Sequence, residues 1–159
     1  LKEGSEPIHS YLYGAFTNCR INDNRERIFP IRSIRDERYS LIYNPNFKSG
    51  ITSNITLSKA LRMVEDDNFR PSNQGLAGSW VDRQDRDDRF SALVHKLHHR
   101  TEYELYDLEE DPHELFNLAE KNAYQSMFKR LKRTLEKKLH SLGDSDPIVT
   151  ERSYLSQSR

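Results

Sequence analysis

The chain has 159 residues, a length typical of one compact domain, and its 25 lysine and arginine residues balance 25 aspartate and glutamate residues. A net charge of zero argues against a general attraction to nucleic acid or membrane surfaces, and no apolar run approaches the roughly 20 residues that span a bilayer. Because only 35% of the residues are hydrophobic, we expect a loop-rich domain with a thin core or a subdomain that packs on a larger partner, and the start at Leu1 favours a fragment.

Three strands are predicted in the first 44 residues. Residues 10–17, 28–34 and 38–44 are rich in aromatic and branched apolar side chains, which favour strands. A two-residue turn, Asp36 and Glu37, separates the last two segments and predicts an antiparallel hairpin. The intervening residues 18–26 are polar and are expected to form a loop.

Two helices and a loop are predicted in the middle of the chain. Residues 57–64 carry apolar side chains at helical spacing behind a threonine that can cap the helix. Residues 66–79 contain a proline and two glycines, so we expect a loop that Trp80 anchors on the core. Residues 90–97 repeat apolar side chains at the spacing of one helix face.

The last third of the chain is predicted to hold a short strand and a long helix. Residues 102–106 indicate the strand, and Asp111-Pro112 followed by a glutamate indicates a capped helix start. Residues 123–142 show the clearest helical pattern, and Gly143 is a natural terminator. The apolar stripe of this helix consists of Tyr124, Phe128, Leu131, Leu135, Leu139 and Leu142. The elements together predict an α+β fold, with a small antiparallel sheet of about four strands and the long C-terminal helix packed on one face.

The most specific motif lies in residues 104–119, which read ELYDLEEDPHELFNLA. This stretch resembles the ELYDLxxDPxExxNLA signature near the C-terminus of sulfatases. Residues 29–44 read FPIRSIRDERYSLIYN and are similar to the YPMRxVRTxRYKLIxN stretch of the same family. The continuation to Asn46 and Phe47 resembles the sulfamidase (N-sulfoglucosamine sulfohydrolase) branch.

The resemblance implies a division of the chain and a set of partners. Residues 1–26 would connect from an upstream α/β catalytic domain through a strand and a polar loop. Residues 27–143 would form the C-terminal subdomain of an alkaline-phosphatase-like sulfatase, and residues 144–159 a polar tail. The implied partners are the catalytic domain and a sulfated carbohydrate, and the implied location is periplasmic, secreted or lysosomal.

The resemblance also implies where the chemistry lies. The family hydrolyses sulfate esters or sulfamates, including those of sulfated amino sugars in glycosaminoglycans, with a formylglycine and a calcium ion of the catalytic domain. Formylglycine forms within Cys/Ser-x-Pro/Ala-x-Arg, but Cys19 is followed by Arg, Ile, Asn and Asp. No acidic set matches the calcium ligands, so we predict no catalytic residue, metal ligand or cofactor here, and an inactive fragment. The alternative is a non-catalytic module that binds anionic glycans.

The predicted substrate contacts lie in residues 18–25. Asn18, Arg20, Asn22 and Arg25 offer amides and guanidinium forks that suit sulfate oxygens, and the alternative is a solvated polar loop. For Arg32 a structural ion pair at the seam with the catalytic domain is favoured over a catalytic role.

Three other groups of polar residues have ordinary structural explanations that we favour. His95, His98 and His99 include a pair one helical turn apart, but no third metal ligand can be identified. The acidic residues between 107 and 111 lack the spacing of a calcium loop and fit a capped turn. The basic face of the last helix fits a solvated surface better than a nucleic-acid site.

Overall fold

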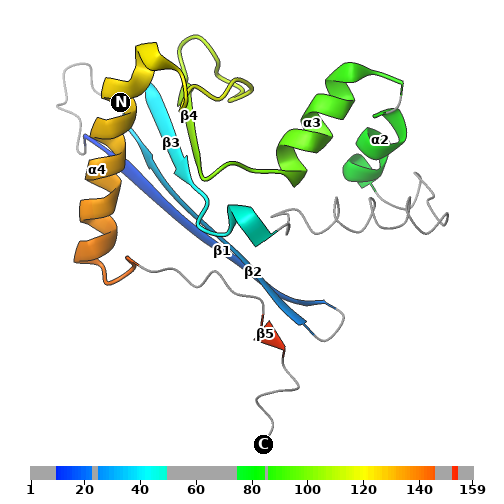
Figure 1. Cartoon of the computed structure of the whole chain (residues 1–159), viewed down its shortest axis with the longest axis horizontal. Coiled ribbons are helices and arrows are strands. Elements are labelled where there is room, and N and C mark those ends of the chain that lie inside the picture. Colours follow the sequence, from blue (N-terminus) through cyan, green and yellow to red (C-terminus); the bar gives the residue numbers. More distant parts are fainter. Residues whose placement is uncertain (1–9, 23–24, 50–74, 85, 146–151, 154–159) are drawn as a thin grey trace, which may run out of the picture. The chain divides into compact units, whose positions relative to one another are not determined.

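A computed structural model describes residues 10–22, 25–49, 75–84, 86–145 and 152–153 of the chain (Figure 1), with the backbone alone for residues 17–22, 25–28, 49, 75–77, 98 and 152–153. The chain divides into two compact units, which are described separately. The first contains residues up to 17, 30–45 and 102–149, and the second contains residues 18–29, 46–101 and 150–159. The predicted helix at 57–64 lies outside the described residues.

One sheet runs through the chain in the order β1-β2-β3-β4. Its strands are β1 (Leu12–Asn22), β2 (Arg25–Arg35), β3 (Tyr39–Tyr43) and β4 (Tyr103–Asp107), and a short β5 (Arg152–Ser153) pairs with β2. β3 pairs antiparallel with β2 and with β4, so that Leu41 lies opposite Ile34 on one side and Leu105 on the other. The predicted hairpin is confirmed, since Arg35 pairs with Ser40 across the turn.

The core of the first unit lies between the sheet and helix α4 (Gln125–Ser141), which runs alongside the strands in Figure 1. Ile34, Leu41 and Leu105 from the sheet are fully buried together with Leu131 from the helix. Because alternate residues of a strand face the same side, Tyr39 and Tyr43 flank Leu41 against the same core. The predicted α+β fold, a four-stranded antiparallel sheet with the C-terminal helix on one face, is therefore confirmed.

Helix α4 ends as the sequence predicts, at a glycine. Gly143 has a φ of 69°, and its N–H donates to the His140 carbonyl while the Asp144 N–H donates to the Leu139 carbonyl. These two bonds are the pattern of a Schellman cap, which satisfies carbonyls left over at the helix end. The predicted apolar stripe is wrong at Leu142. This residue lies past the end of α4 and is 64% exposed.

The predicted helix start at Asp111-Pro112 is wrong, because the chain forms a turn there without continuing as a helix. The Glu114 N–H donates to the Asp111 carbonyl, and the Asp111 carboxylate accepts from the Phe116 N–H. Glu114 has a φ of 53°, a left-handed conformation that a right-handed helix cannot contain. The capped turn that was favoured over a calcium loop is what the structure contains at Asp111.

In the second unit, helix α2 (Gly75–Arg83) packs against helix α3 (Asp88–His98). The α3 prediction is confirmed, and its N-cap is Asp87, whose carboxylate accepts from the Arg89 N–H. The predicted loop at 66–79 is wrong for residues 75–79, which open α2. Glycine disfavours a helix by only about 1 kcal/mol, and packing against a neighbouring helix outweighs that cost.

Residues 18–26 correct a further prediction. They were expected to form a loop, yet β1 continues to Asn22 and β2 begins at Arg25. Backbone pairing in a ladder does not depend on side-chain polarity, so polar residues continue a strand that has a partner. Within the predicted tail, Asp144 bonds Arg32 of β2, and Arg152–Ser153 pairs with Arg25 and Glu26.

Candidate functional site

The four predicted substrate contacts all lie in strands. Asn18, Arg20 and Asn22 are alternate residues of β1, and Arg25 is the first residue of β2. Alternate residues of one strand lie on the same face of a sheet, so the first three positions share a face. Their contact with substrate stays a prediction.

His95 of α3 and His99, the C-cap of that helix, lie close together. The rings of His95 and His99 lie 4.8 Å apart between centroids and are tilted by 42°. No group of three or more potential ligands occurs among the described residues. The described helices also include none that is long and apolar enough to cross a membrane.

Arg32 forms the structural ion pair that was favoured for it, but with a partner in its own chain. Its guanidinium donates to both carboxylate oxygens of Asp144, at 3.0 Å for the Nη2–Oδ1 contact. Arg32 also donates to the Phe16 carbonyl of β1 at 3.2 Å. The Arg32 guanidinium holds the pKa of Asp144 below its ordinary value, so the pair stays charged.

A second arginine, Arg38, binds the last residue of β4, Asp107. Its guanidinium donates to both oxygens of the buried Asp107 carboxylate at 2.7 to 3.0 Å, in the bidentate geometry of arginine and carboxylate. This hydrogen bonding from Arg38 lowers the pKa of Asp107. The same arginine reaches Glu109 at 3.1 Å.

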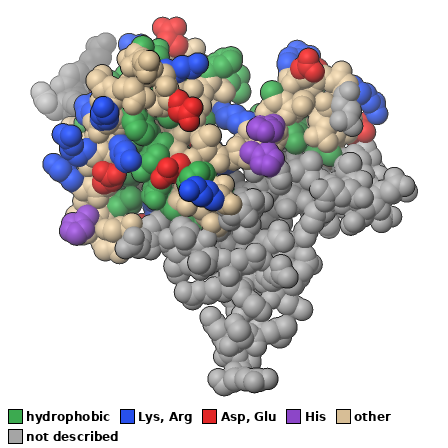
Figure 2. Space-filling view, viewed as in Figure 1, with side chains coloured by type: hydrophobic (Ala, Val, Ile, Leu, Met, Phe, Trp, Pro, Cys, Tyr) green, Lys and Arg blue, Asp and Glu red, His purple; other side chains and the backbone are tan. Residues whose placement is uncertain are grey.

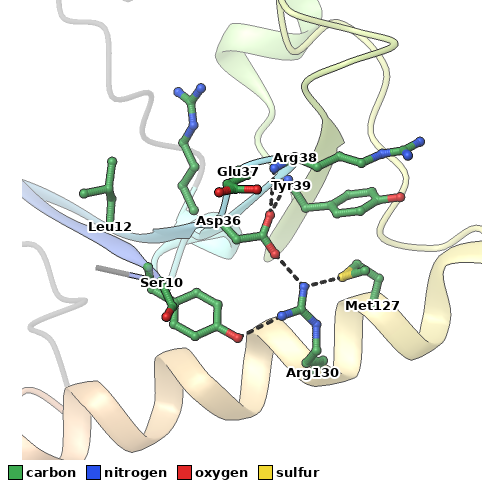
Figure 3. Close-up of a pocket in the computed structure, with 10 residues that line it drawn as sticks. Ser10, Leu12, Asp36, Glu37, Arg38, Tyr39, Met127 and Arg130 are labelled. Atoms are coloured by element: carbon green, nitrogen blue, oxygen red, sulfur yellow. Dashed lines mark hydrogen bonds and ion pairs between the residues drawn. The ribbon is translucent and has the colours of Figure 1, made fainter. Parts of the chain in front are cut away.

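Beside the β2–β3 turn lies an open cleft of about 810 Å³ (Figure 3). Arg130 of α4 crosses it, bonding Asp36 of the turn and, at 2.8 Å, the Tyr11 hydroxyl. Burial disfavours the charge of Asp36, but bonds from the Tyr39 N–H and from Arg130 outweigh burial and lower its pKa. Arg130 therefore links α4 to the turn through its ion pair with Asp36. Arg38, which also lines the cleft, forms an ion pair with Asp107.

The sheet face opposite α4 is partly uncovered in the first unit. Leu12 and Phe16 of β1 are 64% and 55% exposed on this face, and Gly14 lies between them. A hollow of about 350 Å³ is lined there by Gly14, Ile31, Ser33 and Ile42, among others. A Cβ on Gly14 would lie 2.5 Å from Ser33 Oγ, too close for the two side chains to fit without a shift. The face offers apolar surface for a partner.

A groove of about 300 Å³ lies between the sheet and the C-terminal half of α4. Tyr43 and Tyr103, opposite each other on β3 and β4, stack in it with ring centroids 4.9 Å apart. Lys132 Nζ lies 4.5 Å from the centre of the Tyr103 ring, and Glu136 and His140 line the same groove. Sequence reasoning missed this site, because the two tyrosines are 60 positions apart and meet only once the register of β3 and β4 is known.

These arrangements suit binding and support, and none of the described clusters has the geometry of a catalytic centre. Ser145 Oγ lies 3.5 Å from His140 Nδ1, at the outer limit of a hydrogen bond, and both residues are exposed. An activated nucleophile needs a closer base that a third group orients. The remaining described charge clusters are ion pairs that hold turns, strands and the helix end.

Two comparisons with known proteins agree with this description. Residues 83–141 match the model of a family described as N-sulphoglucosamine sulphohydrolase, C-terminal. The chain is also 30% identical over 137 residues to an ulvan-active sulfatase of Formosa agariphila, which covers 86% of this chain and 22% of that protein. The chain thus spans about a fifth of the length of the relative that it matches.

The α+β fold and the two matches together support the class of sulfatase C-terminal regions for this chain. Within that class its matched family is the C-terminal part of N-sulphoglucosamine sulphohydrolases. The sulfatase resemblance that the motif at 104–119 indicated is confirmed.

Proposed function

We propose that this chain is the supporting C-terminal subdomain of a sulfatase that hydrolyses the sulfate esters or sulfamates of sulfated carbohydrates. The observation that carries the proposal is the similarity to a sulfatase over 86% of the chain. The matched family is named for N-sulphoglucosamine, and the relative is named for activity on ulvan. Because these names differ, the proposed substrate class is sulfated carbohydrate, with amino sugars of glycosaminoglycans as the finer hypothesis.

The chemistry of the parent protein is proposed to lie in an upstream catalytic domain. There a formylglycine would supply the nucleophile, and a calcium ion would stabilise the charge that develops on the sulfate. This chain's own residues would hold the fold and contact the substrate, with Asn18, Arg20, Asn22 and Arg25 as the proposed contacts. In support of this division, the motif at 104–119 has a structural role: the Asn117 side chain bonds the backbone of Leu105 and of Tyr103 in β4.

We propose that the catalytic domain of the same parent docks on the sheet face opposite α4. Leu12 and Phe16 expose large apolar surfaces there, which a solvated subdomain would otherwise leave in water. Most of the relative's length lies outside the match, so the parent has ample chain to cover this face. Burying an exposed leucine or phenylalanine contributes roughly 1.5–3 kcal/mol each, enough to make docking sensitive to both residues.

The docking can be tested in the full-length parent with Leu12→Glu and Phe16→Glu. We expect each variant to lower the unfolding temperature of the parent while leaving the far-ultraviolet circular dichroism of the 159-residue chain unchanged. Leu142→Glu is the matched control, since Leu142 is equally exposed but lies at the end of α4. Equal effects of all three substitutions on the parent would contradict docking at this face.

The division of labour is tested by activity. The 159-residue chain is expected to show no turnover of an aryl sulfate or of N-sulfoglucosamine, whereas the parent is expected to hydrolyse one of them. Turnover by the chain alone would contradict the proposal. A parent reading frame without a Cys/Ser-x-Pro/Ala-x-Arg motif would favour the alternative of a non-catalytic glycan-binding module.

A further inference from the structure

The groove between β3, β4 and α4 has the composition of a small-ligand site. Pockets for small ligands begin at about 300 Å³ and combine apolar walls with a few placed polar groups. Here Leu135 and Leu139 contribute apolar wall, the stacked Tyr43 and Tyr103 contribute aromatic surface, and Lys132 is the cation. Other polar atoms come from Glu136, His140 and Ser145.

The charged side chains around the groove form longer ion pairs than those in the larger cleft beside Asp36. In the cleft, Arg130 and Arg38 are each held by a carboxylate within hydrogen-bond distance. In the groove, Lys132 reaches Glu136 only at 3.9 Å, and both side chains remain partly exposed. A lysine at that distance can turn toward a bound anion at little cost, because exposed ion pairs contribute about 0–1 kcal/mol.

The pairing of Lys132 with Tyr103 places a positive charge beside an aromatic ring, which is the combination that an anionic saccharide needs. The apolar face of a sugar ring packs on aromatic surface, the ammonium group binds a sulfate or carboxylate, and Glu136 can accept from sugar hydroxyls. Helix α4 carries six lysine and arginine residues and one glutamate, so its field attracts anions to the groove. Figure 2 shows lysine and arginine side chains gathered at the surface over α4.

We propose that the groove lined by Tyr43, Tyr103, Lys132, Glu136 and His140 binds one anionic saccharide unit. The proposal rests on the proposed function, which supplies sulfated carbohydrate as the substrate, and it assigns this chain a second contact with that class of molecule. The groove is separate from the predicted contacts in β1 and β2, which belong to other residues of the chain.

The experiment is a titration of the ¹⁵N-labelled 159-residue chain with N-sulfoglucosamine, followed by two-dimensional amide NMR. We expect saturable shifts that cluster at residues 103 and 132–140. N-acetylglucosamine, which has no anionic group, is expected to bind more weakly. Lys132→Met is expected to weaken binding about tenfold, as the loss of one charge-assisted hydrogen bond would.

Lys129→Met is the matched control, because Lys129 is an exposed lysine of the same helix and does not line the groove. It should change the affinity less than twofold. Tyr43→Leu removes the ring and keeps apolar volume, so it should weaken binding while the dispersion of the spectrum is retained. If Tyr43→Leu unfolds the chain, the comparison of Lys132→Met with Lys129→Met decides the question.

Three results would overturn the proposal: equal effects of the two lysine substitutions, equal affinity for N-acetylglucosamine, or shifts confined to Lys129, Arg133 and Lys137. The titration records binding and not hydrolysis. An inactive parent would therefore sink the proposed function while saturable binding still supports the groove, and an active parent whose groove fails to bind would sink the groove alone.

Discussion

Arg32 and Asp144 are 112 positions apart, and their ion pair joins the second strand of the sheet to the C-terminal cap of the last helix. Arg32 is buried, and it also donates to backbone carbonyls of β1 and of its own strand. One guanidinium therefore ties together two strands and the C-terminal cap of α4.

Removing the carboxylate should destabilise the first unit measurably. Asp144→Ala leaves Arg32 buried without its carboxylate, and we expect a loss of about 1–3 kcal/mol in the free energy of unfolding, since Asp144 itself is partly exposed. Urea unfolding followed by circular dichroism measures the loss. Glu136→Ala, which removes a loosely paired exposed carboxylate, should change the free energy by no more than about 0.5 kcal/mol.

The stability of the sheet should fall in acid. Hydrogen bonds from Arg38 lower the pKa of Asp107, and hydrogen bonds from Arg32 lower that of Asp144, both below the ordinary value of 3.8. A carboxyl whose folded pKa is depressed contributes stability that is present above the unfolded pKa and is lost as the pH falls through the folded pKa. The urea concentration at the midpoint of unfolding should therefore decrease once the pH is lowered below about 4. In Asp107→Asn this drop should be smaller, and an unchanged pH profile would contradict the assignment.

Asn117 should matter through its side-chain hydrogen bonds to the backbone. Its Oδ1 accepts from the Leu105 and Ala119 N–H groups at 2.9 Å, and its Nδ2 donates to the Tyr103 carbonyl at 3.1 Å. Asn117→Ala is expected to cost about 1–3 kcal/mol, because the Leu105 N–H loses its partner. Asn117→Asp keeps the acceptor and loses only the donor, so hydrogen exchange of the Leu105 amide should stay slow in it and become fast in the alanine variant.

The core prediction concerns two leucines near each other in sequence. Leu131 is fully buried, and Leu131→Ala should cost about 2–5 kcal/mol in unfolding free energy by leaving a cavity. Leu142, which shares the helical spacing, is exposed past the end of α4, so Leu142→Ala should cost less than about 0.5 kcal/mol. Comparable losses for the two variants would show that Leu142 packs in solution.

The elements with a clear period could be predicted from the sequence alone. The hairpin around Asp36 and the stripe of α4 follow from alternation at two and near 3.6 residues, which the chain displays without its tertiary context. The extent of β1 and β2 could not be predicted, because residues 18–22 and 25–26 are polar and their strand structure depends on backbone pairing. The helical start at Gly75 was missed for a similar reason, since packing of α2 against α3 offsets the glycine.

The candidate sites were harder to predict than the fold. Arg32 could be assigned an ion pair from its place in a strand, but its partner, Asp144, follows a glycine cap whose geometry sequence does not display. The groove depends on Tyr43 meeting Tyr103, a pairing set by the register of two strands distant in sequence. The substrate contacts at Asn18, Arg20, Asn22 and Arg25 stay predictions.

The turn at Asp111 and the backbone hydrogen bonds of Asn117 give the motif at 104–119 a structural role. The Asp111 and Asn117 side chains bond the chain's own backbone, so these two residues of the motif stabilise the fold and do not identify a reaction. A protein that has lost its catalytic residues can keep the motif intact, because the fold still requires the motif's hydrogen bonds. A set of sequences identified by this motif alone will therefore contain both active enzymes and relatives that retain only the fold.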